Sequence, residues 1–262
     1  MTKVFLDYDQ KALDAQYEQR VWVPHAEDII RRYGELSDAV RSRIGEPVTG
    51  RYGAAPAETL DIYGEGGKAF VFVHGGAWKR QSKRQNAFAA GMIVQAGAAY
   101  VALDFAPLPT VTLSEMVAQV CRGIEWVHAH LSRKIVLCGH SSGAHLAACA
   151  LTKTNAVGNA LVVSGIYDLL PVRLSTRNDY VRLDERLEHE YSPIRHVDEI
   201  RCPVTVAWAE KEAAEFYRQS SEFAKRLGAP TIIGKDMNHF EICLTLADPH
   251  APLGKAALDM LR

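Results

Sequence analysis

The sequence is poor in cysteine, and no two cysteines form a C-x-x-C motif. The 262 residues include five, which are widely spaced: Cys121, Cys138, Cys149, Cys202 and Cys243. Most of them lie in apolar runs, where a thiol usually acts as a small buried hydrophobic group. Such a set predicts neither a disulfide framework nor a catalytic or redox thiol.

The sequence also lacks an excess of charge of either sign. It contains 30 Lys and Arg residues and 31 Asp and Glu residues, for a net charge of −1, and it has no long run of like charge. A chain of this kind has no basic stripe that could neutralise a phosphate backbone, so we expect no nucleic-acid partner.

Long apolar runs are missing as well. No window approaches the roughly 18 uninterrupted apolar residues that a membrane-spanning helix requires. Residues 1–9 have no apolar core of the length found in a signal peptide. We therefore expect a cytoplasmic protein with no membrane partner.

What the sequence does contain is an alternation of short apolar bursts with longer amphipathic stretches. A chain of this length can bury roughly 70–75% of its unfolded surface without disulfides or a structural metal. The bursts lie at residues 69–73, 99–103, 134–138, 160–164, 204–208 and 231–233. They predict an α/β fold in which helices cover both faces of a mostly parallel sheet. Residues 59–63 indicate a further strand, paired antiparallel at the sheet edge.

The helices expected between the bursts span residues 115–130, capped by Ser114, and residues 143–152 and 212–227. Two segments do not fit the alternation. Residues 1–50 are polar and helical in pattern, and residues 169–200 are charged and irregular. Segments of this kind usually lie over the ends of the strands. We expect one domain over residues 1–262, with residues 1–50 as an N-terminal cap segment and 169–200 as a lid-like insertion.

The most informative segment follows the third apolar burst and reads Gly139-His140-Ser141-Ser142-Gly143. This is the G-x-S-x-G nucleophile elbow, found between a strand and a small-residue helix. A chance match arises in roughly one chain in fifteen of this size, but the flanking strand and helix argue against chance. The elbow places the Ser141 hydroxyl above the strand ends as the nucleophile and leaves the Ser142 amide free to donate to a developing oxyanion.

A second motif follows the first burst, some 65 residues before Ser141, and reads His74-Gly75-Gly76-Ala77. HGG-type loops at this place in a hydrolase supply a second oxyanion donor. A simple Gly-Gly turn is the alternative, but the order of the two motifs favours the catalytic interpretation. We predict an oxyanion hole from Gly75, Gly76, Ala77 and Ser142, with the amides of Gly76 and Ala77 directed inward.

The general base is expected after the last strand, because hydrolases with this elbow have the chain order serine, acid, histidine. His239 occupies that place and would take the proton from Ser141. His140 and His145 flank the elbow at a spacing that does not fit a zinc site. We predict that His140 lines the substrate pocket.

The acid of the triad is less clearly marked. Many hydrolases carry G-x-x-Asp after the strand that ends near residue 208, and Ala209-x-x-Glu212 has the same spacing with Glu for Asp. Glu212 is our first choice and Glu210 the second. In a third interpretation both are ordinary acids at a helix N-terminus, and Asp236 or a weaker triad orients the histidine.

Three aromatic side chains near these motifs are candidate walls of the substrate pocket, although each could equally belong to the core. They are Trp78, Tyr167 and Phe240.

With these motifs the sequence resembles the arylformamidase (kynurenine formamidase) branch of the hormone-sensitive-lipase-like α/β-hydrolases. The resemblance spans roughly residues 59–244 and rests on segments 74–78, 139–146, 164–169, 215–220 and 238–241. It implies an α/β-hydrolase fold and hydrolysis of a small ester or of N-formyl-kynurenine by a Ser-Asp-His triad, without metal or organic cofactor. The sequence departs from the pattern at Glu212, where the family has aspartate.

We therefore predict a cofactor-independent serine hydrolase that cleaves a small carboxylic ester or an N-formyl aryl amide through an acyl-enzyme. Its partner would be a small-molecule substrate. The alternatives are a general short-chain carboxylesterase, a thioesterase, or a non-catalytic hydrolase fold used for binding. The sequence gives no prediction of oligomeric state.

Overall fold

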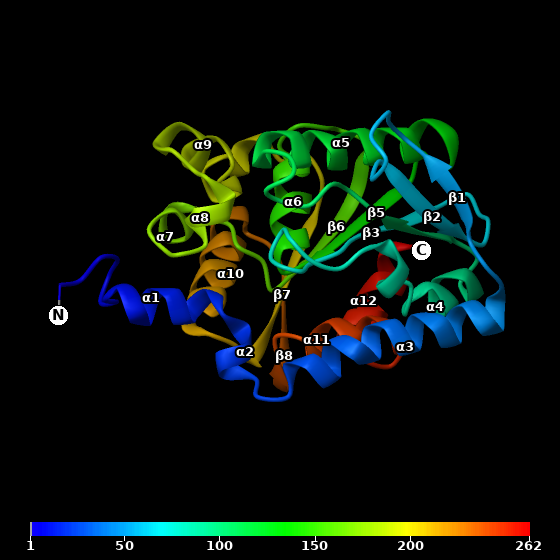
Figure 1. The fold of residues 1–262 in the computed structure, drawn as a ribbon. Helices are drawn as coiled ribbons and strands as arrows, with labels where there is room; N and C mark the ends of the chain where they lie inside the picture. The colour runs from blue at the N-terminus through cyan, green and yellow to red at the C-terminus, as the bar shows by residue number, and fades with distance from the viewer. Residues whose placement is uncertain (1) are drawn as a thin grey trace.

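The apolar bursts form strands of a single eight-stranded sheet in the computed structural model, which describes residues 2–262 (Figure 1). The sheet order is β1-β2-β4-β3-β5-β6-β7-β8. The strands are β1 (Val48–Arg51), β2 (Thr59–Tyr63), β3 (Ala69–Val73), β4 (Ala99–Leu103), β5 (Ile135–His140), β6 (Val157–Val163), β7 (Val204–Lys211) and β8 (Thr231–Asn238). Strands β3 to β8 are parallel, while β1 and β2 pair antiparallel.

Strand β2 is antiparallel, as predicted, but it does not lie at the edge of the sheet. It pairs with β4 on one side and with β1 on the other. The expectation of an edge position was wrong because β1 lies outside β2. The sequence did not reveal β1, which is a short, largely exposed strand without an apolar pattern.

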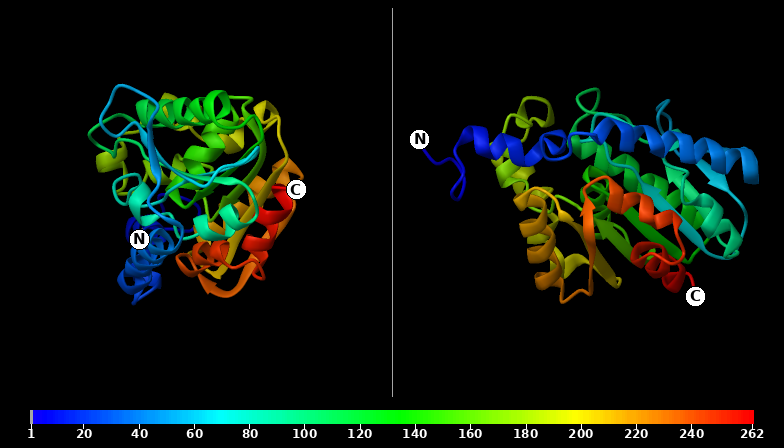
Figure 2. Two further views of the ribbon diagram at one scale, coloured as in Figure 1. Left: turned by 90° about the vertical axis from the view of Figure 1, so that its right-hand side faces the viewer. Right: turned by 90° about the horizontal axis from the view of Figure 1, so that it is seen from below.

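The helices cover both faces of the sheet (Figures 1 and 2). Helices α5 (Leu113–His130), α6 (Ser142–Leu151) and α10 (Ala214–Leu227) share one apolar cluster with the sheet. Helices α3 (Ala26–Ile44), α4 (Ala90–Gln95), α11 (Glu241–Leu244) and α12 (Pro252–Met260) share the cluster on the opposite face. The predicted α/β architecture is confirmed.

Helix α5 begins two residues earlier than expected. The hydroxyl of Thr112, and not that of Ser114, accepts a hydrogen bond from the Glu115 backbone N–H at 3.2 Å. This is the usual satisfaction of a free amide at a helix N-terminus.

The first fifty residues divide between two places. Helix α1 (Gln10–Tyr17) lies beside α10 and the insertion, and α2 (Gln19–Trp22) follows it, whereas α3 packs across a face of the sheet (Figure 1). The inward face of α3 carries Ile29, Tyr33 and Val40 into the core. Helix α3, which lies within the segment expected as a cap, is therefore packed on the sheet. Among residues 2–262, no helix is long and apolar enough to cross a membrane.

The charged insertion forms three short α-helices, followed by the 3₁₀ turns Pro193–Arg195 and Val197–Glu199, next to α6 and α10 (Figure 1). The α-helices are α7 (Leu170–Arg173), α8 (Asn178–Val181) and α9 (Glu185–Glu190). The register pairs Val73 with Gly139, and Val163 with both His140 and Ala207. The carboxyl ends of β3, β5, β6 and β7 therefore lie level at one edge, where α/β folds place their ligand sites.

Candidate active site

Ser141 occupies a strained turn between β5 and α6. Its backbone has φ +57° and ψ −126°, a conformation that typically costs a non-glycine residue about 1–3 kcal/mol. A Cβ on Gly139 would lie 2.4 Å from the Gly143 carbonyl oxygen, and a Cβ on Gly143 would lie 2.1 Å from that of Val73. Glycine at both positions is therefore what allows the helix to start so close to the strands.

The Ser141 hydroxyl faces a histidine that lies 98 residues further along the chain. Its Oγ lies 2.9 Å from Nε2 of His239, which follows β8 directly. The imidazole is buried, and the ring of Phe216 packs edge-on against it at 4.8 Å between centroids. The 2.9 Å between Ser141 Oγ and His239 Nε2 is within the distance that proton transfer from serine to histidine requires.

Behind the histidine lies Glu212. Its Oε2 is 3.6 Å from Nδ1 of His239, and the side chain of Glu212 is 0% exposed. The other carboxylate oxygen accepts hydrogen bonds from the Ala209 N–H at 2.9 Å and from the Ser164 hydroxyl. Within residues 2–262, Oε2 and Nδ1 have no hydrogen-bond partner, and they face one another.

The two other candidate acids lie elsewhere. Glu210 is exposed, and its carboxylate accepts a hydrogen bond from the Asp236 N–H at 2.8 Å. The Asp236 carboxylate pairs with Lys211 at 3.3 Å on the surface. Of the three acids, Glu212 is the one placed to orient His239.

The glycine-rich loop after β3 lies directly against the elbow. A Cβ on Gly75 would come within 2.9 Å of the His140 carbonyl oxygen, and Gly76 and Ala77 have φ of +104° and +55°. In the described part of the chain, no hydrogen bond uses the amides of Gly76, Ala77 or Ser142. These amides are free to bind an anion, and Ser142 opens a helix, whose N-terminus favours negative charge.

Two of the predicted pocket walls are in the core instead. Trp78 is 2% exposed, and its indole N–H donates to Nδ1 of His145 at 3.2 Å. Tyr167 is 0% exposed and stacks on Phe223 at 4.1 Å between ring centroids. Of the two interpretations left open for Trp78 and Tyr167, pocket wall or core, the packing favours the core, and neither side chain lines the cavity at Ser141.

Ser141 and His239 open onto a cavity of about 250 Å³, which is also lined by His140 and Phe240. Its rim is charged. The charged residues that line it are Asp14, Glu18, Arg20, Lys79, Arg80 and Arg177. In residues 2–262, no group of three or more His, Cys, Asp or Glu side chains is arranged to hold a metal ion.

His140 holds the loop that carries His239. Burial, with a smaller contribution from His239, lowers the pKa of His140 to about 3, so the ring is neutral. Its Nε2–H donates to the backbone carbonyl of His239 at 2.8 Å. His140 thus lines the cavity and also fixes the position of the candidate base.

Sequence reasoning did not identify several contributors to the site. Ser164 supports Glu212 from the end of β6, and the strand-end position of this small polar residue was the available signal. Tyr17 and Tyr180 line the cavity from α1 and α8, and no local pattern marks them, because only tertiary docking brings these helices to the site.

The kynurenine formamidase of Danio rerio is 31% identical to this chain, and the alignment covers 95% of each protein. The chain belongs to the kynurenine formamidase family. The kynurenine formamidase of Salmo salar is 29% identical, with 97% of each protein covered. A family model described as BD-FAE matches residues 60–164. Membership of the kynurenine formamidase family makes the protein a hydrolase of the esterase and formamidase kind.

Solved structures share the fold. A "putative thioesterase" from Silicibacter sp. TM1040 superposes with a TM-score of 0.87 at 24% identity, covering 94% of this chain and 98% of that one. An esterase from Pyrobaculum calidifontis superposes with a TM-score of 0.68 at 16% identity, covering 92% and 95%. The α/β-hydrolase fold predicted from the sequence is thus confirmed for this member of the kynurenine formamidase family.

Proposed function

We propose that this member of the family is a cofactor-independent serine hydrolase that cleaves an N-formyl aryl amide, with small carboxylic esters as further substrates. The observation that carries the proposal is the alignment of Ser141, His239 and Glu212 at one cavity, with Ser141 Oγ 2.9 Å from His239 Nε2. Nucleophile, base and orienting acid in this order are the parts that acyl transfer needs.

In the first half of the reaction, Ser141 Oγ attacks the formyl or acyl carbon while His239 takes the hydroxyl proton. The carbonyl oxygen becomes an oxyanion, and the free amides of Gly76, Ala77 and Ser142 supply hydrogen bonds to it. The C–N or C–O bond then breaks, and His239 returns the proton to the departing amine or alcohol. The carbonyl carbon remains bound to Ser141.

In the second half, water replaces the leaving group. His239 accepts a proton from the water as the water oxygen attacks the acyl-enzyme carbon. The bond to Ser141 Oγ then breaks, and the proton passes to the serine. Formate, or the acid of an ester substrate, is released.

The charges at the rim of the cavity support a substrate with an amino-acid group, such as N-formyl-kynurenine. The residues Lys79, Arg80 and Arg177 line the cavity, and none of them pairs with a carboxylate of residues 2–262. They could receive a substrate carboxylate at the mouth. The names of the two fish relatives favour the same substrate.

The proposal is tested by measuring hydrolysis of N-formyl-kynurenine, p-nitrophenyl acetate and p-nitrophenyl butyrate by the wild type and by Ser141→Ala. We expect wild-type turnover of all three, with the highest kcat/KM for N-formyl-kynurenine, and a loss of about 10⁴-fold or more in the variant. A higher kcat/KM on the esters would identify a carboxylesterase. Full activity in Ser141→Ala would refute the serine mechanism.

A further inference from the structure

The loop that carries the oxyanion amides has a backbone that needs support from its surroundings. Gly76, Ala77 and Trp78 have φ of +104°, +55° and +59°. Glycine adopts such angles freely, but alanine and tryptophan rarely do. A left-handed Ala-Trp pair persists only where neighbouring groups determine it. Those neighbours therefore also determine where the amides of Gly76 and Ala77 point.

Helix α6 binds Trp78 at two points. The Ser142 hydroxyl accepts a hydrogen bond from the Trp78 backbone N–H at 3.1 Å, and Nδ1 of His145 accepts one from the indole N–H at 3.2 Å. Ser142 and His145 are three residues apart on the helix, so their side chains project from the same face. Both are almost fully buried. Ser142 thus offers its own free amide to the site while its side chain holds the facing loop.

The contacts of His145 determine its tautomer. An indole N–H can only donate, so Nδ1 must be the unprotonated nitrogen and Nε2 must carry the hydrogen. Nε2–H then donates to the backbone carbonyl of Tyr191 at 2.9 Å. Burial lowers the pKa of His145 to about 4, so the neutral ring that these two bonds need persists at neutral pH. His145 therefore links Trp78 to the insertion at residues 169–200.

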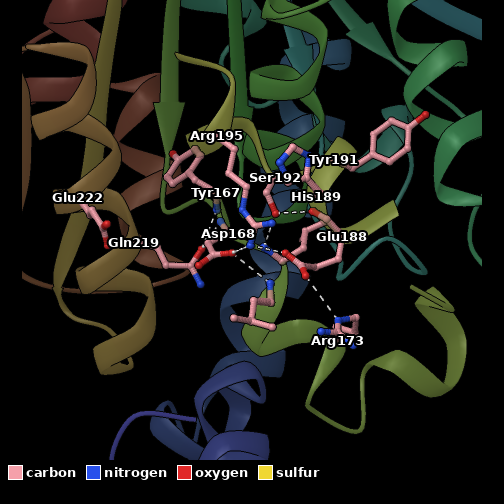
Figure 3. A network of polar contacts seen from close by, with 12 residues as sticks. Tyr167, Asp168, Arg173, Glu188, His189, Tyr191, Ser192, Arg195, Gln219 and Glu222 are labelled. Carbon is pink, nitrogen blue, oxygen red and sulfur yellow. Dashed lines mark hydrogen bonds and ion pairs between the residues drawn. The ribbon is translucent and has the colours of Figure 1, made fainter. Parts of the chain in front are cut away.

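The Tyr191 carbonyl is itself a fixed point, because the chain around it belongs to a polar network (Figure 3). The Ser192 hydroxyl donates to the Glu188 carbonyl at 2.6 Å. The guanidinium of Arg195 bridges the carboxylates of Glu188 and Asp168. The network ties residues 188–195 of the insertion to Asp168, in the loop that follows β6, so the carbonyl that His145 contacts belongs to a hydrogen-bonded segment.

We propose that Ser142 and His145 are positioning residues that clamp Trp78 and thereby hold the amides of Gly76 and Ala77 toward the developing oxyanion. The inference rests on the proposed function, because an oxyanion forms only if the site performs acyl transfer. Since the bonds to the oxyanion strengthen in the transition state, loss of the clamp lowers kcat and leaves KM unchanged.

The test uses Trp78→Phe, which keeps an aromatic ring and removes the indole N–H, and Ser142→Ala, which removes a single oxygen and keeps the backbone amide. We expect each to lower kcat by at least about 10-fold and by less than the roughly 10²–10³-fold loss that follows deletion of an oxyanion donor. A trifluoromethyl ketone analogue of the ester, whose hemiketal oxygen occupies the oxyanion hole, should lose affinity by the same factor as kcat/KM.

Trp208→Phe is the matched control. Trp208 is 4% exposed, yet its indole N–H has no hydrogen-bond partner among the described residues. The substitution therefore reproduces the packing change of Trp78→Phe without removing a hydrogen bond, and kcat and inhibitor affinity should stay at the wild-type values. Should Trp78→Phe fail to fold, Ser142→Ala decides the question, because it changes the volume least.

The clamp is refuted if folded Trp78→Phe and Ser142→Ala retain the kcat and inhibitor affinity of the wild type, or if their loss falls on KM alone. This failure is distinct from failure of the proposed function, which the wild type and Ser141→Ala reveal by themselves. A wild type that hydrolyses neither esters nor N-formyl-kynurenine would overturn both.

Discussion

The acid behind His239 is the feature that most separates this site from the aspartate-containing pattern that its sequence resembles. Glu212 Oε2 stands 3.6 Å from Nδ1 of His239, while its other oxygen accepts two hydrogen bonds. A movement of about 0.5 Å would bring the pair within hydrogen-bond distance. Catalytic hydrogen bonds are often long until substrate binds, so we expect the contact between Glu212 Oε2 and His239 Nδ1 to shorten in the complex with substrate.

Replacing Glu212 with Gln should lower kcat/KM for p-nitrophenyl acetate by about 10²–10⁴-fold, because an amide neither fixes the tautomer of His239 nor stabilises the imidazolium. Glu210→Gln is the control, since that side chain is exposed and bonds to the Asp236 amide, and its rate should match the wild type. If Glu210→Gln loses activity and Glu212→Gln does not, the assignment of the acid is wrong.

The cations at the cavity rim should act on substrate charge. Lys79→Met and Arg80→Met should each raise KM for N-formyl-kynurenine by about 2- to 5-fold, the range of an exposed ion pair, and leave KM for uncharged p-nitrophenyl acetate unchanged. Arg133→Met is the control, because Arg133 is exposed and precedes β5 at the end of that strand remote from the elbow. Equal changes in KM for both substrates would show that charge recognition is not involved.

At the scale of elements, the elbow depends on the close approach of α6 to β3. Gly143→Ala would place a methyl group 2.1 Å from the Val73 carbonyl oxygen. Backbone cannot yield as a flexible side chain does, so we expect a loss of about 1–3 kcal/mol or more in the free energy of unfolding, measured by urea denaturation. Gly158→Ala, whose Cβ would meet nothing nearer than 3.4 Å, should be nearly neutral. Equal stability of the two variants would contradict this account of the elbow.

Local sequence predicted the elements that are buried on both faces. Apolar residues fill β3, β4 and β5, so those strands were recognised with bounds that are the same or nearly so. Strand β1 was missed because an exposed strand needs no apolar pattern.

Side chains whose place depends on distant partners were predicted less well. The sequence left Trp78 open between pocket wall and core, because its partner His145 lies 67 residues further along the chain. The approach of α1 to the cavity depends in the same way on contacts with α10 and the insertion. Motif spacing predicts the candidate catalytic groups because the strand order fixes their positions, and it carries no information on such docking.

At the scale of the whole molecule, the site joins segments from both ends of the chain. Asp14 and Phe240 line the same cavity. The buried imidazoles of His140 and His145 form hydrogen bonds between segments that are far apart in the sequence. His140 bonds to the loop of His239, and His145 bonds both Trp78 and Tyr191. His145 must be neutral to accept the hydrogen bond from Trp78, and burial favours the neutral ring at both positions, so the assembly of the site is coupled to pH.

The pKa values of His140 and His145 are lowered to about 3 and about 4, chiefly by burial. Below an unfolded-state pKa of about 6.5, the unfolded chain binds a proton at each position that the folded chain does not bind. The stabilisation is therefore complete above pH 6.5 or so and is lost as the pH falls toward about 4, with a slope of about 1.4 kcal/mol per pH unit for each histidine.

Urea denaturation between pH 6 and pH 4.5 measures this slope. In His140→Gln and in His145→Gln, the free energy of unfolding should depend on pH less steeply than in the wild type by about 1.4 kcal/mol per unit, whatever the stability of each variant at pH 7. Parallel curves for the wild type and the variants would show that the histidines take up protons equally in both states.

The central claim, that Ser141 is a nucleophile activated by His239, is tested most directly by covalent labelling with a fluorophosphonate, read by intact-protein and peptide mass spectrometry. We predict one adduct on the wild type, located at Ser141, formed far more slowly by His239→Ala and not at all by Ser141→Ala. An unlabelled but folded wild type, or an adduct at another residue in a protein whose Ser141→Ala variant still hydrolyses substrate, would contradict the account.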